Sequence, residues 1–201
     1  MKDILLDSII NNIKKYYNYN DVKLKEIRYG LESLYLSVIK VIVIIILSIF
    51  IHTFDILCMF FVTYGLLRLI CFGLHTKKSI QCWLLSITTF LLIPYLIKTI
   101  TISDQTLLLS SIILLILIGI YSPADTEKRP LIHKRKRIIY KILSIIITSI
   151  YLLIICLTKN ILIKNLLFFS ILLETILILP TSYKILGLKY DNYKSYKRKE
   201  D

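Results

Sequence analysis

The chain has 201 residues, of which 56% are hydrophobic and 19% are charged. Ordinary globular proteins carry about 25% charged residues, and the apolar residues here fall in long blocks, so the disordered, collagen-like and disulfide-rich secreted classes are excluded. Lysines and arginines number 26 against 13 aspartates and glutamates, a net charge of +13. Because the basic residues lie between the apolar blocks, they indicate membrane topology and not nucleic-acid binding.

The first 34 residues differ from the rest because their apolar runs are never longer than three residues. This excludes a cleavable signal peptide. Apolar residues recur there at helical spacing: Ile4, Leu5, Ile9, Ile13, Tyr16 and Tyr17. Such spacing predicts an amphipathic helix that lies on the membrane surface.

Six apolar stretches follow, each close to the roughly 20 residues that cross a bilayer as a helix. They are residues 35–53, 56–73, 80–98, 105–121, 138–158 and 161–180. Lipid-exposed backbone must satisfy its own hydrogen bonds, and nothing here alternates like a barrel strand. We therefore expect an all-α integral membrane protein with about six transmembrane or re-entrant helices. Its expected parts are an amphipathic interfacial segment (1–34), a membrane domain (35–180) and a basic cytoplasmic tail (181–201).

Six spans put both termini on one side of the membrane. If that side is the cytoplasm, the inner segments hold 20 lysines and arginines, whereas the outer loops hold three. The inner segments are residues 1–34, 77–78, 122–137 and 181–201. Since cytoplasmic loops carry the excess of basic residues in membrane proteins, the sequence predicts cytoplasmic termini.

A histidine and a cysteine flank one short inner loop. Ser79 is a suitable N-cap for the span that follows, which puts Cys82 in the first helical turn, where the helix dipole and two neighbouring lysines favour a thiolate. His75 can take the thiol proton and complete an activated nucleophile. On one continuous helix the two α-carbons would lie about 10.5 Å apart. The chain must therefore break between them, and Gly73 allows that break.

Other interpretations of these residues stay open. The spacing of His75 and Cys82 can be a coincidence, or the two could bind zinc together with Cys71, although the spacing matches no common zinc motif. Cys58, Cys71 and Cys156 lie in or beside apolar spans, where a thiol usually behaves as a small hydrophobe. We expect no metal and no cofactor.

Three further residues could support the pair. Arg68, near the inner end of its span, is either a snorkelling anchor or a participant that grips a substrate carboxylate or holds the loop around Gly73. Gln81 could help to stabilise an oxyanion. Ser86, one turn after Cys82, could donate a hydrogen bond near the thiol or simply be a tolerated helix residue.

Acidic residues and one proline carry further expectations. Asp125 and Glu127 lie in a loop on the same side as His75, where either could orient the imidazole or pair with nearby basic residues. Glu174 lies well inside the last span, where a charge is expensive, so we expect it to face inward with a partner. Pro94 should kink the third span.

Two segments of the chain resemble the accessory gene regulator B (AgrB) family. They are residues 68–76, followed by Cys82 and Ser86, and residues 121–130. With the chain length and the number of spans, the resemblance covers nearly the whole chain. The family often has two adjacent glycines before the histidine and an alanine after it, where this chain has Phe72 and Thr76.

The resemblance implies a cysteine endopeptidase in the cell membrane of a Gram-positive bacterium, which processes the propeptide AgrD for quorum sensing. By this analogy Cys82 is the nucleophile and His75 the general base, at the cytoplasmic face. Cys82 would attack the carbonyl at the junction with an acidic C-terminal tail, releasing the tail and forming an acyl-thioester. An internal Cys or Ser of the peptide would then close a thiolactone or lactone ring. A homodimer is a further expectation at the level of the family.

Two other classes of protein are the alternatives. One is a small multi-span peptide exporter, and the other is a membrane scaffold without enzymatic activity that docks an acidic peptide. The spans contain few charges and no matching pair of helices broken by Gly or Pro, which argues against a transporter. Partners of the protease are the propeptide and the lipid bilayer, and nucleic acid is not expected.

Overall fold

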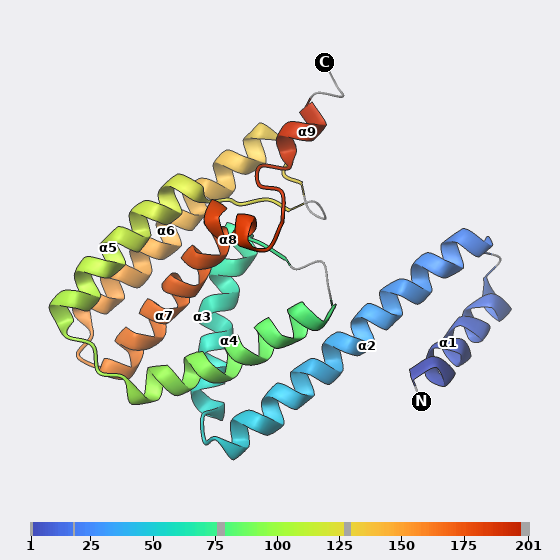
Figure 1. Cartoon of the computed structure of the whole chain (residues 1–201), viewed down its shortest axis with the longest axis horizontal. Coiled ribbons are helices and arrows are strands. Elements are labelled where there is room, and N and C mark those ends of the chain that lie inside the picture. The colour runs from blue at the N-terminus through green and yellow to red at the C-terminus, as the bar shows by residue number, and fades with distance from the viewer. Residues whose placement is uncertain (1, 18, 76–78, 127–129, 198–201) are drawn as a thin grey trace. The chain divides into compact units, whose positions relative to one another are not determined.

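A computed structural model describes residues 2–17, 19–75, 79–126 and 130–197 of the chain. Within these ranges the chain forms nine helices, and an isolated bridge between extended residues joins Phe72 to Ala124. The helices are α1 (Lys2–Tyr16), α2 (Asp21–Phe50), α3 (Phe54–Cys71), α4 (Ser79–Thr99), α5 (Asp104–Tyr121), α6 (Lys134–Leu157), α7 (Ile161–Ile178), α8 (Pro180–Ile185) and α9 (Tyr193–Lys197) (Figure 1). The all-α prediction is confirmed.

Six of these helices, α2 to α7, are long and apolar enough to cross a membrane. They coincide with the six predicted spans, with one notable difference at the first. Helix α2 begins at Asp21 instead of residue 35, so part of the predicted interfacial segment continues into the first span without a break. Its 30 residues make a helix about 45 Å long, whereas the hydrocarbon core is about 30 Å thick. The charged first turns of α2 therefore have room to lie outside the hydrocarbon.

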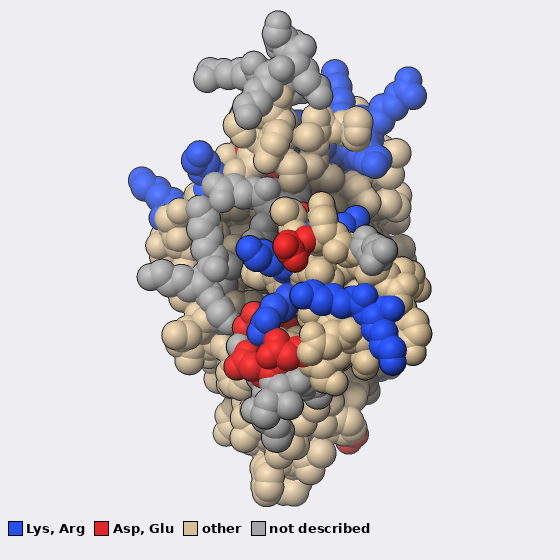
Figure 2. Space-filling model, turned by 90° about the vertical axis from the view of Figure 1, so that its right-hand side faces the viewer, with Lys and Arg blue, Asp and Glu red and all other residues tan. Residues whose placement is uncertain are grey.

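The outward faces of the spans are apolar. Leu69, Ile80 and Leu157 are each at least 70% exposed, which would be costly in water but is the normal state of a helix face in contact with lipid. On the face in Figure 2, lysines and arginines gather in groups, and broad areas carry uncharged residues only. This surface fits a multi-pass membrane protein.

Contacts between α-carbons divide the chain into two compact units, Met1–Ile49 and Phe50–Asp201. In the N-terminal unit, α1 buries Leu6 and Ile10, and α2 buries Leu24. Arg28 of α2 forms an ion pair with Asp7 of α1, with 2.9 Å between Nη1 and Oδ1. Helix α1 is present, but its buried residues are not those of the predicted apolar stripe, in which Tyr16 and Tyr17 are exposed.

In the C-terminal unit, α7 is the central helix. It packs against α3, α4, α5 and α6, and Figure 1 shows it running alongside α5 and α6. Two-thirds of its apolar window, 67%, is buried, compared with 11% for α4. Asn160 begins α7 by accepting a hydrogen bond from the Leu162 N–H at 2.9 Å, which satisfies one of the free donors at the helix start. Pro94 lies inside α4, and the kink expected there stays a prediction.

The segment expected to be a basic tail is partly folded. It forms α8 and α9, and it buries Tyr183 and Asn192 almost completely. Helix α8 packs against α7. The residues after the last span thereby become part of the C-terminal unit.

Candidate functional site

The chain breaks between α3 and α4, as the predicted pair requires. Helix α3 ends at Cys71 and α4 begins at Ser79, so His75 lies on a non-helical loop and Cys82 lies in the first turn of α4. Ser79 is the first residue of the helix instead of its cap, a difference of one position that still leaves Cys82 in the first turn. The side chain of His75 is exposed and that of Cys82 is half-buried. Thr76 lies outside the described residues.

Backbone hydrogen bonds hold the loop before His75 in place. The Gly73 N–H donates to the Ala124 carbonyl at 2.8 Å, and the Ala124 N–H donates to the Cys71 carbonyl at 3.0 Å. On the other side, the Leu74 N–H donates to the Leu177 carbonyl of α7 at 3.0 Å. The two sequence motifs, which are about 50 residues apart in the chain, therefore meet in space, and this contact could not be read from the sequence.

Two consecutive residues of the loop have a positive φ. Gly73 has φ +90°, and a Cβ added there would meet Arg68 Nη1 and would lie 3.1 Å from the Leu177 carbonyl oxygen. Phe72 has φ +65°, a region that favours glycine. Phe72 is also the position at which the resembling family often has a glycine. Its ring packs edge-to-face on Tyr140 of α6, with centroids 5.0 Å apart, which gives this side chain a compensating contact.

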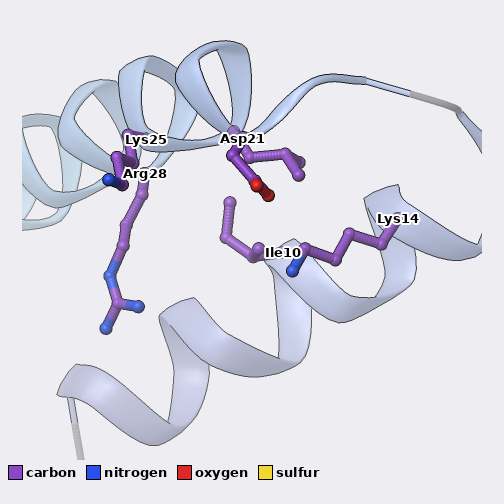
Figure 3. A pocket seen from close by; sticks show the side chains of 6 residues that line it. Ile10, Lys14, Asp21, Lys25 and Arg28 are labelled. Atoms are coloured by element: carbon purple, nitrogen blue, oxygen red, sulfur yellow. The ribbon is translucent and has the colours of Figure 1, made fainter.

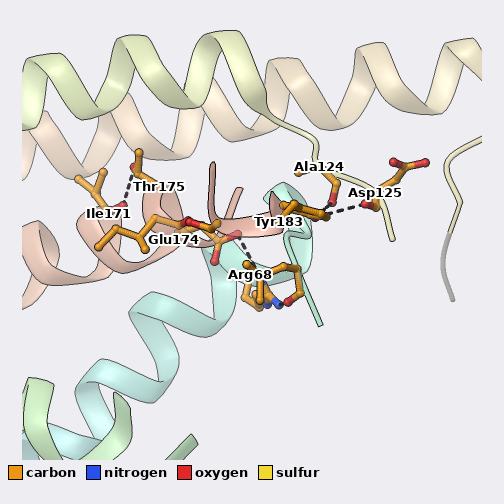
Figure 4. A network of polar contacts seen from close by, with 10 residues as sticks. Arg68, Ala124, Asp125, Ile171, Glu174, Thr175 and Tyr183 are labelled. Carbon is orange, nitrogen blue, oxygen red and sulfur yellow. Dashed lines mark hydrogen bonds and ion pairs between the residues drawn. The ribbon is translucent and has the colours of Figure 1, made fainter. Parts of the chain in front are cut away.

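Arg68 links the loop to α7 (Figure 4). Its Nη2 donates a hydrogen bond to the Leu74 carbonyl, and its Nη1 lies 3.7 Å from Oε1 of Glu174. The Glu174 side chain is completely buried, so its predicted inward orientation and its partner are confirmed. Of the roles considered for Arg68, the geometry matches the one in which it holds the loop around Gly73.

Asp125 fastens the second motif to the C-terminal segment. Its buried carboxylate accepts hydrogen bonds from the backbone N–H groups of Asn192 at 2.9 Å, Tyr193 at 2.8 Å and Leu131 at 3.4 Å. Burial raises the pKa of the Asp125 carboxyl above its usual value, although these three N–H groups act to lower it. Among the described residues, its carboxylate is thus occupied by backbone donors and not by basic side chains. Glu127 lies outside the described residues.

Tyr183 joins the same network and was not predicted. Its hydroxyl donates to the carbonyls of Ala124 at 3.3 Å and Asp125 at 3.2 Å (Figure 4). Burial raises the pKa of this phenol well above its usual value, so it stays a hydrogen-bond donor at neutral pH. The only signal in the sequence was an aromatic residue shortly after Pro180, which is too weak to separate a buried tyrosine from one in a tail.

The remaining predicted residues lie on the first two turns of α4. Gln81 is exposed and Ser86 is half-buried. For the zinc alternative, no group of three or more His, Cys, Asp or Glu in the described parts of the chain could hold a metal ion. The geometry therefore gives no support to a site formed by Cys71, His75 and Cys82.

The N-terminal unit contains a cavity of about 240 Å³ between α1 and α2 (Figure 3). Its lining residues are Ile10, Lys14, Asp21, Leu24, Lys25 and Arg28. None of the predicted site residues belongs to this set.

Comparisons with known proteins agree with these motifs. The family model described as Accessory gene regulator B matches residues 6–178. An AgrB-like protein of Clostridium acetobutylicum is 29% identical over 194 residues, which cover 96% of this chain and 93% of the relative. Accessory gene regulator protein B of Staphylococcus aureus strain JH9 is 34% identical over 155 residues, or 76% of this chain and 83% of the relative. An AgrB-like protein of Listeria innocua is 31% identical over 179 residues, or 85% and 84%. No solved structure matches the chain.

Proposed function

This chain belongs to the accessory gene regulator B family, and from that premise we propose that it is a membrane cysteine endopeptidase. Its substrate is an AgrD-type propeptide, from which it removes an acidic C-terminal tail. The observation that carries the proposal is the break between α3 and α4. Because of this break, His75 lies on the loop after α3 and Cys82 lies in the first turn of α4. Helices α3 and α4 also pack against each other.

In the first step of the proposed reaction, His75 takes the proton of the Cys82 thiol. Sγ then attacks the carbonyl carbon at the junction with the tail, and the C–N bond breaks. The protonated imidazole gives its proton to the leaving amine, which departs as the new N-terminus of the tail. The first turn of a helix assists because its unpaired N–H groups and positive dipole end favour a thiolate and a developing oxyanion.

In the second step, a Cys or Ser of the bound peptide attacks the acyl-thioester. The bond to Sγ of Cys82 breaks, the thiol is regenerated, and the peptide leaves as a thiolactone or lactone. Because water competes for the thioester, a site at the membrane edge favours attack by a group already held nearby.

The charge distribution supports a cytoplasmic location for this site. The segments predicted to face the cytoplasm hold 20 of the 26 lysines and arginines, which favours the cytoplasmic side for the loop that carries His75. The resulting field would attract an acidic tail. A propeptide made in the cytoplasm would thus meet the basic face before it meets the thiol.

The test is cleavage of the propeptide in membranes that contain single variants. Cys82→Ala and His75→Ala should each reduce tail release by at least about 100-fold at unchanged protein abundance. Mass spectrometry of the peptides measures the released tail. A haloacetamide or a peptide chloromethyl ketone should form a covalent adduct on Cys82.

Cys58→Ala and Cys156→Ala are the matched controls, because both thiols lie on exposed helix faces away from the loop and should leave cleavage unchanged. Normal cleavage by Cys82→Ala would overturn the proposal. A parent protein that binds the peptide without cutting it would instead indicate the scaffold alternative.

A further inference from the structure

We propose that Glu174 is a positioning residue for His75, because it holds Arg68, and Arg68 holds the backbone of the residue that precedes the histidine. The inference rests on the proposed function, in which His75 must stay within reach of Cys82. It adds a buried carboxylate of α7 to the groups on which the reaction depends.

Burying the Glu174 carboxylate is energetically costly. Its side chain is completely buried in the interior of α7, and within the described residues neither carboxylate oxygen accepts a hydrogen bond. Nη1 of its partner Arg68 lies 3.7 Å from Oε1 of Glu174. This distance is longer than the roughly 2.7–2.9 Å of a strong charged hydrogen bond. A buried ion pair with such geometry contributes little to stability, so stability alone does not account for a carboxylate at this depth.

Helix α7 holds the loop residue Leu74 at two points, once directly and once through Arg68. The Leu177 carbonyl accepts the Leu74 N–H at 3.0 Å. Glu174 lies three residues earlier, on the same face of the helix, and acts through Arg68 on the Leu74 carbonyl. Both polar groups of the Leu74 backbone are therefore held from one helix face, directly before His75.

The orientation of the Arg68 guanidinium depends on Glu174. The Arg68 side chain is 28% exposed and lies in the last turn of α3, within reach of the membrane–water interface for a long basic side chain. Glu174 keeps the guanidinium turned inward, where one nitrogen meets the carboxylate and the other meets the Leu74 carbonyl. With a neutral group at position 174, the guanidinium would turn to the interface, and the loop would lose its second point of attachment.

The first test measures the loop without measuring cleavage. Hydrogen exchange of the amides of Gly73 and Leu74 is compared in the full-length protein, in its Glu174→Gln variant and in a Thr175→Val variant. Thr175 is the matched control because it is buried on the same helix and, among the described residues, its hydroxyl bonds within α7 to the Ile171 carbonyl. We expect about tenfold faster exchange or more for Glu174→Gln and no change for Thr175→Val. Unchanged exchange in Glu174→Gln would overturn the proposal whatever the protein catalyses.

The second test measures kinetics with the propeptide. Glu174→Gln should lower kcat by about 10- to 100-fold with little change in KM, and Glu174→Asp should restore part of the loss because it keeps the charge. The double variant Arg68→Gln/Glu174→Gln should be no slower than the slower single variant, since both residues act through one contact. Additive losses, or a rise in KM alone, would contradict the proposal. If Cys82→Ala is inactive while Glu174→Gln cleaves normally, this inference fails and the proposed function stands.

Discussion

Helices α4 and α7 are both apolar and similar in length, but they are held very differently. The apolar window of α7 is 67% buried, and that of α4 is 11% buried. Helix α7 packs on α3, α4, α5, α6 and α8, whereas α4 packs mainly on α3 and α7. The loop before His75 is bonded to α7, and Cys82 lies on α4. The comparison teaches that the two members of the proposed pair are positioned by different means: the histidine by a dense polar network, the cysteine by a helix with few neighbours.

The largest effect on stability and cleavage should come from adding one methyl group to the loop that is bonded to α7. Gly73→Ala places a Cβ against Arg68 and the Leu177 carbonyl at a φ of +90°, so we expect a loss of about 2–4 kcal/mol in stability and of nearly all tail release. Thermal unfolding in detergent and a cleavage assay measure the two losses.

Gly65→Ala is the control for this change, because it lies on α3 with nothing within 4 Å of the added carbon. It should be neutral or stabilise the helix by up to about 1 kcal/mol. If Gly73→Ala left stability and tail release as little changed as Gly65→Ala does, the claim that polar contacts hold the loop before His75 rigidly would be wrong.

A second pair of variants compares the two helices directly. Ile171→Ala removes a fully buried side chain from the centre of α7, so it should cost about 2 kcal/mol or more through lost packing. Leu84→Ala removes a side chain of α4 that is 63% exposed, so it should cost less than about 0.5 kcal/mol. Unfolding in denaturant measures both, and equal losses would contradict the difference in packing.

The smallest expected effect is a pH dependence at the edge of the dense network. Burial raises the pKa of Asp125 from 3.8, so the folded state binds this proton more tightly than the unfolded state does. Stability attributable to Asp125 should therefore fall as the pH rises from about 3.8 to the higher folded pKa, and then stay level.

Asp125→Asn tests this dependence, because the amide does not titrate in that range. The change in melting temperature with pH should differ between parent and variant in that window, and the difference should be constant above it. The amide also loses one backbone N–H bond, since one of its two positions is a donor. A pH profile identical to that of the parent would show that Asp125 does not titrate as its burial requires.

Most of the fold could be predicted from the sequence, and so could the break at the site. Apolar blocks of about 20 residues admit only helices in lipid, and all six expected spans are present. Glycine at position 73 indicated where the chain could leave the helix. The start of α2 at Asp21 was missed, because an amphipathic surface helix and the polar end of a long span show similar periodicity.

The network behind the site could not be predicted in the same way. Tyr183 and Leu177 carry no motif. Their roles depend on the return of α7 to Leu74, about 100 residues earlier in the chain, and of α8 to Ala124, 59 residues earlier. Asp125 and Arg68 were recognised as candidates, but the sequence left several partners open for each. Only packing selected the backbone donors for Asp125 and the Leu74 carbonyl for Arg68.

Hydropathy alone determined that this chain is a multi-span helical membrane protein, because the cost of placing backbone and charge in hydrocarbon depends on local composition. Which spans lie at the centre, and which carbonyls hold the loop before His75, depended on contacts between distant helices. In lipid those contacts are chosen by close packing and by buried polar pairs. Such contacts leave no periodic trace in a single sequence, so only the tertiary structure could decide them.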